Sequence, residues 1–145
     1  MKHYVMGFVF NSQLNRVLLI HKRNPDWQAG RWNAFGGKIE LADLSPYNAM
    51  LRESLEETGH NYPFKHRVTF TCPGGTVYVF AAMLNTEHIP FYQLEAEILH
   101  VWDIDSLPAR IMANLKWLIP VCLSTIQFPL LVSDTTLGVN SAGGE

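Results

Sequence analysis

The sequence contains few cysteines, and no apolar run in it is long. Cys72 and Cys122 lie far apart and outside any Cys-x-x-Cys pair, which indicates neither a zinc site nor a disulfide framework. The apolar run from Tyr4 to Phe10 lacks a following small-residue cleavage site and is too short to span a membrane. We therefore expect this run to be a strand, and the protein to be cytoplasmic with reduced thiols.

Neither charge is in excess. Eleven Lys and Arg residues stand against thirteen Asp and Glu residues, for a net charge of −2. This balance argues against the broad basic face that a nucleic-acid polymer or an anionic membrane attracts. We expect a small molecule as the partner, bound by a monomer or a homodimer.

The length of 145 residues, 48% of them hydrophobic, suits one globular domain. We place that domain at residues 1–132. The remaining segment, 133–145, has no positive charge and little that a core could bury, so we expect a flexible tail.

Segments rich in β-forming residues alternate with two amphipathic segments, which predicts a mixed α/β fold. The expected strands are 4–10 and 17–21, a first hairpin; 31–35, ending at Gly36-Gly37; 68–71 and 76–84, a second hairpin; and 98–102. The first helix is expected to begin after Ser45, with Pro46 at its first position, and to stop at Gly59. The second spans 109–125 and is kinked or shortened by Pro120.

The first helix has two distinct faces. The arc expected to pack on the core contains Tyr47, Met50, Leu51, Leu55 and Thr58. The arc expected to face outward contains Glu53, Glu56 and Glu57.

The three glutamates of this helix repel one another. Glu53 and Glu57 form a like-charge pair one turn apart, and only Arg52, in the weaker orientation toward Glu56, offsets the charge. On an arbitrary helix such glutamates are solvated surface. A divalent cation would turn the repulsion into binding, and Mg²⁺, with Mn²⁺ as the alternative, suits carboxylate ligands and substrate phosphates. The cluster therefore indicates metal-dependent phosphate chemistry.

The segment GGKIELADLSPYNAMLRESLEETG, residues 36–59, resembles the Nudix box, a glycine-led loop followed by a helix reading R-E-x-x-E-E-x-G. The matching residues are Gly37, Arg52, Glu53, Glu56, Glu57 and Gly59. The loop departs from the family pattern, because Asp43 stands for the usual acidic residue and is separated from Arg52 by one residue more than usual. Ser54 and His60 occupy positions that are usually apolar, so we expect slightly weaker helix packing.

The resemblance implies a Nudix-type α/β/α sandwich, with a mixed β-sheet between the box helix and the second helix. It also implies that Glu53, Glu56 and Glu57 hold the metal. Glu97, which precedes the late tryptophan Trp102, is implied as a further metal ligand or base, with Glu95 as its competitor. One carboxylate among Glu53, Glu56 and Glu97 would activate the water, while Arg52 would orient a box glutamate.

The segment GRWNAFGGKIE, residues 30–40, resembles MutT-type family members that hydrolyse nucleoside triphosphates. This resemblance implies Mg²⁺-dependent cleavage of a nucleoside triphosphate, a dNTP or an oxidised purine nucleotide to the monophosphate and pyrophosphate. It places Asn33 and Asn114 at the base, whereas a turn cap and an exposed helical amide are the alternatives for these two residues.

The other candidate contacts have ordinary alternatives. Gly37 and Lys38 are candidates for the phosphates, although a surface lysine is as good an interpretation of Lys38. The charged end of the second strand, 21–23, could also receive phosphate. Trp32 is our choice for a stacking platform over Trp27, Trp102 and Trp117, since tryptophan is more often a core residue.

Two other functions remain open at this point. One is hydrolysis of ADP-ribose, a dinucleoside polyphosphate or a nucleotide sugar within the same family. The other is a non-catalytic nucleotide-binding module, against which the complete set of box glutamates argues.

Overall fold

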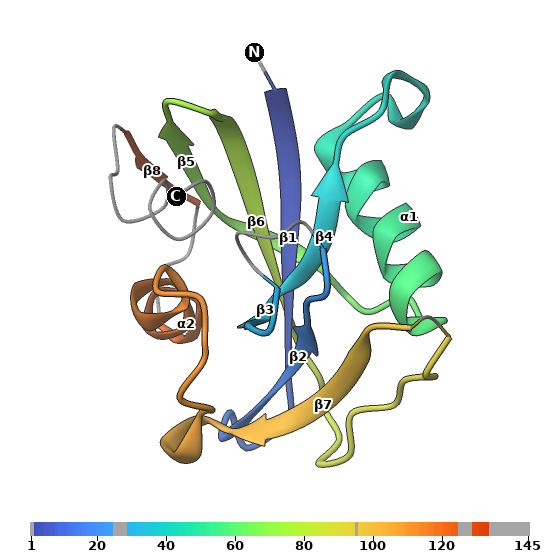
Figure 1. Ribbon diagram of the computed structural model, residues 1–145, viewed down its shortest axis with the longest axis vertical. Helices are drawn as coiled ribbons and strands as arrows, with labels where there is room; N and C mark the ends of the chain where they lie inside the picture. Colours follow the sequence, from blue (N-terminus) through green and yellow to red (C-terminus); the bar gives the residue numbers. More distant parts are fainter. Residues whose placement is uncertain (1, 25–28, 95, 125–128, 134–145) are drawn as a thin grey trace.

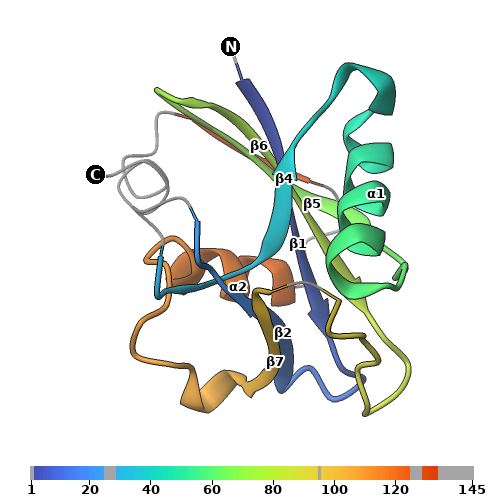
Figure 2. The ribbon, with the colours of Figure 1, turned by 45° about the vertical axis from the view of Figure 1, so that its right-hand side comes forward.

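The computed structural model describes residues 2–24, 29–94, 96–124 and 129–133, which form one mixed sheet with a helix on each face (Figures 1 and 2). The strands are β1 (Lys2–Phe10), β2 (Arg16–His21), β3 (Trp32–Asn33), β4 (Phe35–Lys38), β5 (Lys65–Cys72), β6 (Gly75–Met83), β7 (Ile98–Asp103) and β8 (Leu130–Val132). The helices are α1 (Pro46–Thr58) and α2 (Leu115–Leu123), with 3-10 turns η2 (Leu41–Asp43) and η3 (Ile104–Ser106). None of the described helices is long and apolar enough to cross a membrane.

The strand order is β3-β2-β1-β6-β5-β8, with β4 also paired to β1 and β7 also paired to β2. The pairs β1–β6 and β5–β8 are parallel, and the others are antiparallel. β2 meets β1 only at Phe10, whereas β4 pairs with β1 from Tyr4 to Gly7. β2 and β4 therefore pair with different parts of β1, and β4, which contains the double glycine, lies beside α1. Both expected hairpins and the mixed sheet are confirmed.

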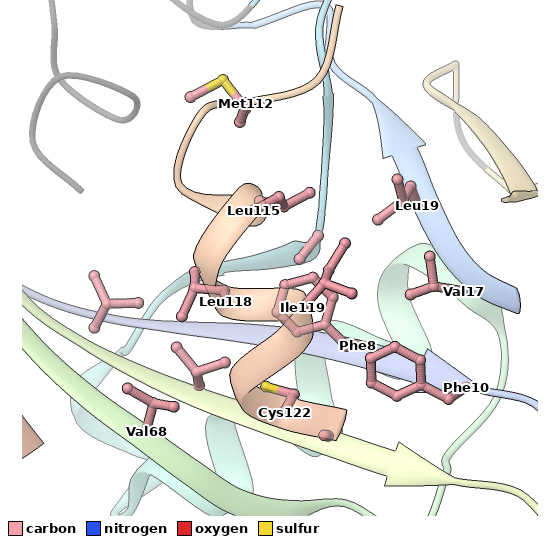
Figure 3. Packing of buried hydrophobic residues seen from close by; sticks show 14 of the residues in the cluster. Phe8, Phe10, Val17, Leu19, Val68, Met112, Leu115, Leu118, Ile119 and Cys122 are labelled. Atoms are coloured by element: carbon pink, nitrogen blue, oxygen red, sulfur yellow. The ribbon is translucent and has the colours of Figure 1, made fainter. Parts of the chain in front are cut away.

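Each face of the sheet has its own core. In β1, Val5 and Val9 pack in the cluster that includes residues of α1, while Phe8 and Phe10 pack in the cluster that includes residues of α2. Figure 3 shows Phe8 and Phe10 beside Ile119 and Cys122 of α2. Since successive strand residues point to opposite faces, a sheet covered on both sides needs continuous apolar strands. This explains the unbroken apolar runs of the sequence and confirms the three-layer sandwich.

Local sequence signals set the ends of α1. The side chain of Ser45 accepts a hydrogen bond from the Asn48 N–H at 3.0 Å, and Pro46 is the first helical residue. Gly59 takes the left-handed conformation, with φ of 72°, and its N–H donates to the Leu55 carbonyl. Both predicted ends of the helix are confirmed.

The predicted faces of α1 are partly wrong. Thr58 is buried as predicted, but Tyr47 and Leu55 are 45% and 48% exposed, and Ser54 and Glu57 are buried. Ser54 and Thr58 can be buried because their hydroxyls donate to the carbonyls of His60 and Ser54, respectively. The helix therefore turns Glu57 toward the sheet instead of toward solvent, while the expected effect of Ser54 on the helix packing stays a prediction.

Two other predicted elements differ. β4 runs through Gly36 and Gly37 and does not end there. The second helix begins only at Leu115, because the preceding segment pairs with β3: the Trp32 N–H donates to the Arg110 carbonyl, and the Met112 N–H donates to the Trp32 carbonyl. α2 continues past Pro120 to Leu123. The predicted tail lies, apart from Ser133, outside the described residues.

Candidate active site

A pair of buried carboxyl groups lies where α1 packs on β4. Glu57 is 7% exposed, and its Oε2 accepts a hydrogen bond from the Gly36 N–H at 3.1 Å. The neighbouring carboxyl groups of Glu53 and Glu57 interact with each other. Burial raises the pKa of both groups, that of Glu57 to about 8, with the nearby charge of Lys22 lowering it in part. The pair therefore retains a proton at neutral pH.

Gly37 is a glycine because Glu53 lies directly against it. A Cβ at this position would stand 2.4 Å from Glu53 Oε2 and 2.8 Å from its carboxyl carbon. Any side chain at this position would push the Glu53 carboxyl group away from the strand. The sequence pattern thus encodes a close approach between the backbone of β4 and the carboxyl groups of α1.

Arg52 joins the box loop to the glutamates. Its guanidinium binds Asp43 in a bidentate manner, with Nε 2.7 Å from Oδ1 and Nη2 2.9 Å from Oδ2. The Arg52 hydrogen bond, with a further one from the Glu40 N–H, lowers the pKa of the Asp43 carboxyl group. Nη1 of Arg52 donates to Glu53 Oε2 at 3.1 Å and to Glu56 Oε1 at 3.3 Å. Asp43 therefore takes the place of the usual acidic residue, and Arg52 contacts two box glutamates.

The extra residue of the box loop is accommodated before the helix. Residues 41–43 form the 3-10 turn η2, and Leu44 then adopts the left-handed conformation, with φ of 70°. Leu41 and Leu44 are 97% and 89% exposed as a result. The ion pair between Asp43 and Arg52 is intact despite the longer loop.

Glu53 and Glu57 fit a hard divalent cation by the chemistry of their donors, because two adjacent carboxyl groups that share a proton can exchange it for the ion. Across the described ranges, no three His, Cys, Asp or Glu side chains are arranged to hold a metal ion. Arg52 binds one oxygen of Glu53 and one oxygen of Glu56. Glu56, with its side chain 55% exposed, is the box glutamate that can turn most freely.

Glu97 contacts the end of β2. Its Oε2 accepts from the backbone N–H groups of Arg23 and Asn24 at 2.7 and 3.4 Å, and its Oε1 lies 3.4 Å from Lys22 Nζ. The charge of Lys22 also lowers the pKa of Glu57 in the carboxyl pair. The sequence of the 21–23 segment predicts a phosphate-binding patch or an ordinary charged strand end, and it contains no signal for the contact with Glu97. Glu95 lies outside the described residues, and Lys38 is exposed on β4.

The two amides predicted for the base are both buried. Asn33 is 9% exposed, and its Oδ1 accepts from the Ala34 N–H at 2.8 Å. Asn114 is 1% exposed, and neither polar atom of its side chain has a hydrogen-bond partner in the described part of the chain. The pairing of Trp32 with Ile111 brings the two segments together. An exposed helical amide is therefore the wrong interpretation of Asn114.

Aromatic rings surround Trp32. The centroids of His21 and Trp102 lie 5.0 and 5.2 Å from that of Trp32, and His100 lies 4.8 Å from Trp102. A hollow of about 350 Å³ adjoins this cluster and is lined by Arg16, His100, Val101, Trp102, Asp103 and Ser106. Another, of about 400 Å³, lies beside the box loop, away from the carboxyl pair. Trp27 lies outside the described residues.

Comparison with known proteins agrees with this geometry. The model of the NUDIX domain family matches residues 2–116. The chain is 28% identical over 131 residues to the oxidized purine nucleoside triphosphate hydrolase of Mus musculus, covering 86% of this chain and 81% of that protein. A crystal structure of the MutT protein from Bacillus halodurans has a TM-score of 0.65 at 26% identity, over 86% of this chain and 84% of that one.

Two structures with lower identity share the fold. The NUDIX domain of Shewanella oneidensis NrtR, crystallised with ADP ribose, has a TM-score of 0.59 at 20% identity, over 71% of this chain and 73% of that one. A MutT/nudix family protein from Enterococcus faecalis has the same TM-score and identity, over 70% of this chain but only 43% of its own length. With the box helix, its glutamates and the family match in agreement, the chain belongs to the Nudix family and is a MutT-like hydrolase acting on pyrophosphate bonds.

Proposed function

We propose that the protein is a Mg²⁺-dependent pyrophosphohydrolase that cleaves a nucleoside triphosphate to the monophosphate and pyrophosphate. A dNTP or an oxidised purine nucleotide is the favoured form of the substrate. The buried carboxyl pair of Glu53 and Glu57 carries this proposal, because a proton shared at neutral pH marks a site where a divalent cation would replace it. The name of the mouse relative supports the choice of substrate.

Glu53 and Glu57 would hold the cation, Mg²⁺ or alternatively Mn²⁺, and Glu56 would join them once its exposed side chain turns from Arg52. When bound, the cation supplies charge neutralisation for the phosphates and polarises a phosphoryl oxygen. Arg52 orients Glu53 through a 3.1 Å hydrogen bond, while its bidentate contact with Asp43 fixes the guanidinium. Gly37 leaves the space that the Glu53 carboxyl group occupies.

One carboxylate among Glu53, Glu56 and Glu97 would position the water or take its proton. Glu56 is the most accessible of them, with half of its side chain in solvent. Glu97 is held by the end of β2 and the ammonium of Lys22, so a metal-binding role for it would require these contacts to break. Lys38, at the exposed end of β4, is available to phosphate.

The base would lie at the other end of the site, between Asn33 and Asn114. A buried amide that lacks hydrogen bonds is unfavourable unless a ligand supplies them. The edge of a purine offers a donor and an acceptor side by side, which a single amide can pair. Trp32, partly exposed beside β2, would supply the stacking surface. The two free cysteines agree with the cytoplasmic location that we propose.

A substrate panel tests the proposal. Release of pyrophosphate and phosphate would be measured with Mg²⁺ for the common and oxidised purine nucleoside triphosphates, ADP-ribose, dinucleoside polyphosphates and nucleotide sugars. We expect pyrophosphate release from a triphosphate, with a preference among purine bases. Preferential cleavage of ADP-ribose or a dinucleoside polyphosphate would assign a different reaction, and tight binding without turnover would assign a binding module.

A further inference from the structure

The side chain of Gln93 forms two hydrogen bonds to the backbone next to Glu97. Its amide Nε2 donates to the Glu97 carbonyl, and its Oε1 accepts from the Leu99 N–H at 2.9 Å. These two backbone groups lie on either side of the first residue of β7. A side-chain amide thus takes the place of a neighbouring strand at the point where β7 begins. Such an arrangement fixes the backbone from which the Glu97 carboxylate projects.

Glu97 in turn fixes Lys22. Its carboxylate accepts hydrogen bonds from two backbone N–H groups at the end of β2 and lies 3.4 Å from Lys22 Nζ. The side chains of Lys22 and Glu97 are only 15% and 19% exposed, so solvent screens this pair less than a surface ion pair. The charge of Lys22 acts on Glu57 of the carboxyl pair. The location of Glu97 therefore fixes the Lys22 ammonium, whose charge acts on that pair.

The segment that contains Gln93 is also attached to the box helix. The Tyr92 N–H donates to the Thr58 carbonyl at 2.8 Å. The Tyr92 ring stacks on His60 with centroids 5.0 Å apart and an interplanar angle of 12°. In Figure 1 the yellow segment before β7 lies at the C-terminal end of α1. One end of this segment thus contacts the helix that carries Glu53 and Glu57, and the other holds Glu97.

We propose that Gln93 is a positioning residue of the active site, which holds the Glu97 carboxylate and the Lys22 ammonium in place relative to the glutamates of α1. Gln93 is exposed, and its hydrogen bonds to the backbone on either side of Ile98 carry this role. The kinetic consequence of this inference rests on the proposed function, whereas its structural consequence does not.

The test compares Gln93→Met with Gln13→Met in the full chain. Methionine has a similar length but forms neither hydrogen bond. Gln13 is a suitable control because it is an exposed glutamine whose Oε1 also accepts a hydrogen bond, from Asn15 Nδ2 in the turn between β1 and β2. Amide hydrogen exchange would be followed by NMR. We expect the N–H groups of Leu99 and Arg23 to exchange about threefold to tenfold faster in Gln93→Met and at the wild-type rate in Gln13→Met.

The kinetic arm measures kcat and KM on the best substrate of the panel. We expect kcat to fall about fivefold or more in Gln93→Met, because a small displacement of catalytic groups is costly, with KM and the preference among bases unchanged. Gln13→Met should match the wild type. Gln93→Glu keeps the acceptor for Leu99 but places a carboxylate against the Glu97 carbonyl, so it should be impaired at least as much.

The outcomes separate this inference from the proposed function. An inactive wild type would refute the proposed function. The amide exchange rate of Arg23 would then test the positioning role of Gln93 by itself. An active wild type with unchanged kcat in Gln93→Met would refute the positioning role. Faster exchange at every amide, together with equal losses in kcat and base preference, would also refute the positioning role, because it indicates a loosened fold. If Gln93→Met does not fold, Gln93→Glu provides the same comparison.

Discussion

The carboxyl group of Glu53 occupies the space in which a side chain at residue 37 would have to lie, with Oε2 2.4 Å from the Cβ that Gly37 lacks. We predict that Gly37→Ala displaces Glu53 and lowers kcat/KM about tenfold or more, since misplacement of a catalytic group is costly. The backbone of Gly37 is outside the left-handed region, so the expected effect comes from the contact with Glu53 and not from backbone strain.

Gly74→Ala is the matched control for Gly37→Ala. A Cβ at Gly74 meets nothing within 4 Å, so this variant should keep wild-type activity and thermal stability. Full activity in Gly37→Ala would show that the contact with Glu53 has no part in turnover.

The raised pKa of Glu57 predicts how stability depends on pH. An ordinary glutamate has a pKa of 4.5, whereas burial raises that of Glu57 to about 8 in the folded protein. Between these values the folded state holds a proton that the unfolded state has released. The contribution of Glu57 to stability is therefore largest below pH 4.5 and is lost as pH rises to 8. Over this range the stability of the metal-free protein should fall with a slope of up to about 1.4 kcal/mol per pH unit.

Denaturant unfolding of wild type and Glu57→Gln at several pH values measures this effect, because the difference between them removes the contribution of other groups. The variant should be the more stable of the two at pH 8 without metal, since the like-charge pair is absent. A difference that does not change with pH would contradict the shared proton.

Turnover should require a divalent cation and the glutamates that hold it. We predict that a chelator abolishes activity, that Mg²⁺ or Mn²⁺ restores it, and that Glu56→Gln or Glu57→Gln lowers kcat by about a hundredfold or more with the fold intact. Circular dichroism would establish that both variants fold. Wild-type rates in chelator would exclude the metal-dependent mechanism.

The sequence predicted those parts of the molecule that depend on neighbouring residues in the chain. Ser45 and Gly59 end α1 through hydrogen bonds within one turn, so both ends of the helix could be predicted. The start of α2 could not, since residues 110–112 pair with Trp32 far away in the sequence. For the same reason the spacing of apolar residues placed Glu57 outside, whereas its hydrogen bond with Gly36 belongs to the tertiary structure.

The candidate site shows the same limit. The family pattern located Arg52 and the three glutamates, and the structure adds the partners that determine their charge. Lys22 and Gln93 come near Glu97 only when β2 and β7 pair, and no local motif marks either residue. The catalytic and binding roles of the residues we named remain predictions.

Leu44 offers a test of the lengthened box loop. Its φ of 70° is unfavourable for a side chain with a Cβ, and its side chain is 89% exposed and loses little packing when removed. We predict that Leu44→Gly raises the free energy of unfolding by roughly 0.5 to 1 kcal/mol, once the greater freedom of glycine in the unfolded chain is included. Leu41→Gly, at an equally exposed residue without positive φ, should not stabilise the protein. Thermal unfolding of the two variants makes the comparison.

Asn114 and Asn11 are both buried asparagines, and they predict opposite effects of the same substitution. Both polar atoms of the Asn11 side chain have partners: its Nδ2 donates to Asn15 Oδ1 at 2.7 Å, and its Oδ1 accepts from the N–H groups of Asn15 and Arg16. The amide of Asn114 has no hydrogen-bond partner among the residues that the structure describes. Replacing an unsatisfied buried amide by an apolar side chain of similar volume removes a desolvation penalty, whereas replacing a satisfied one leaves its partners unpaired.

We therefore expect Asn114→Leu to be as stable as the wild type or about 1 kcal/mol more stable, and Asn11→Leu to be less stable by about 1 to 3 kcal/mol. The substrate panel should show the cost of the first change. If Asn114 pairs with the base, Asn114→Leu and Asn33→Ala should each lower kcat/KM about threefold to tenfold or more for the preferred base and much less for the others. A stabilised Asn114→Leu variant with unchanged preference among bases would mean that the amide does not contact the base. An equal loss of kcat/KM for every base would mean that the substitution damages the phosphate end of the site. The structure records no contact between Asn114 and the carboxyl pair among the described residues.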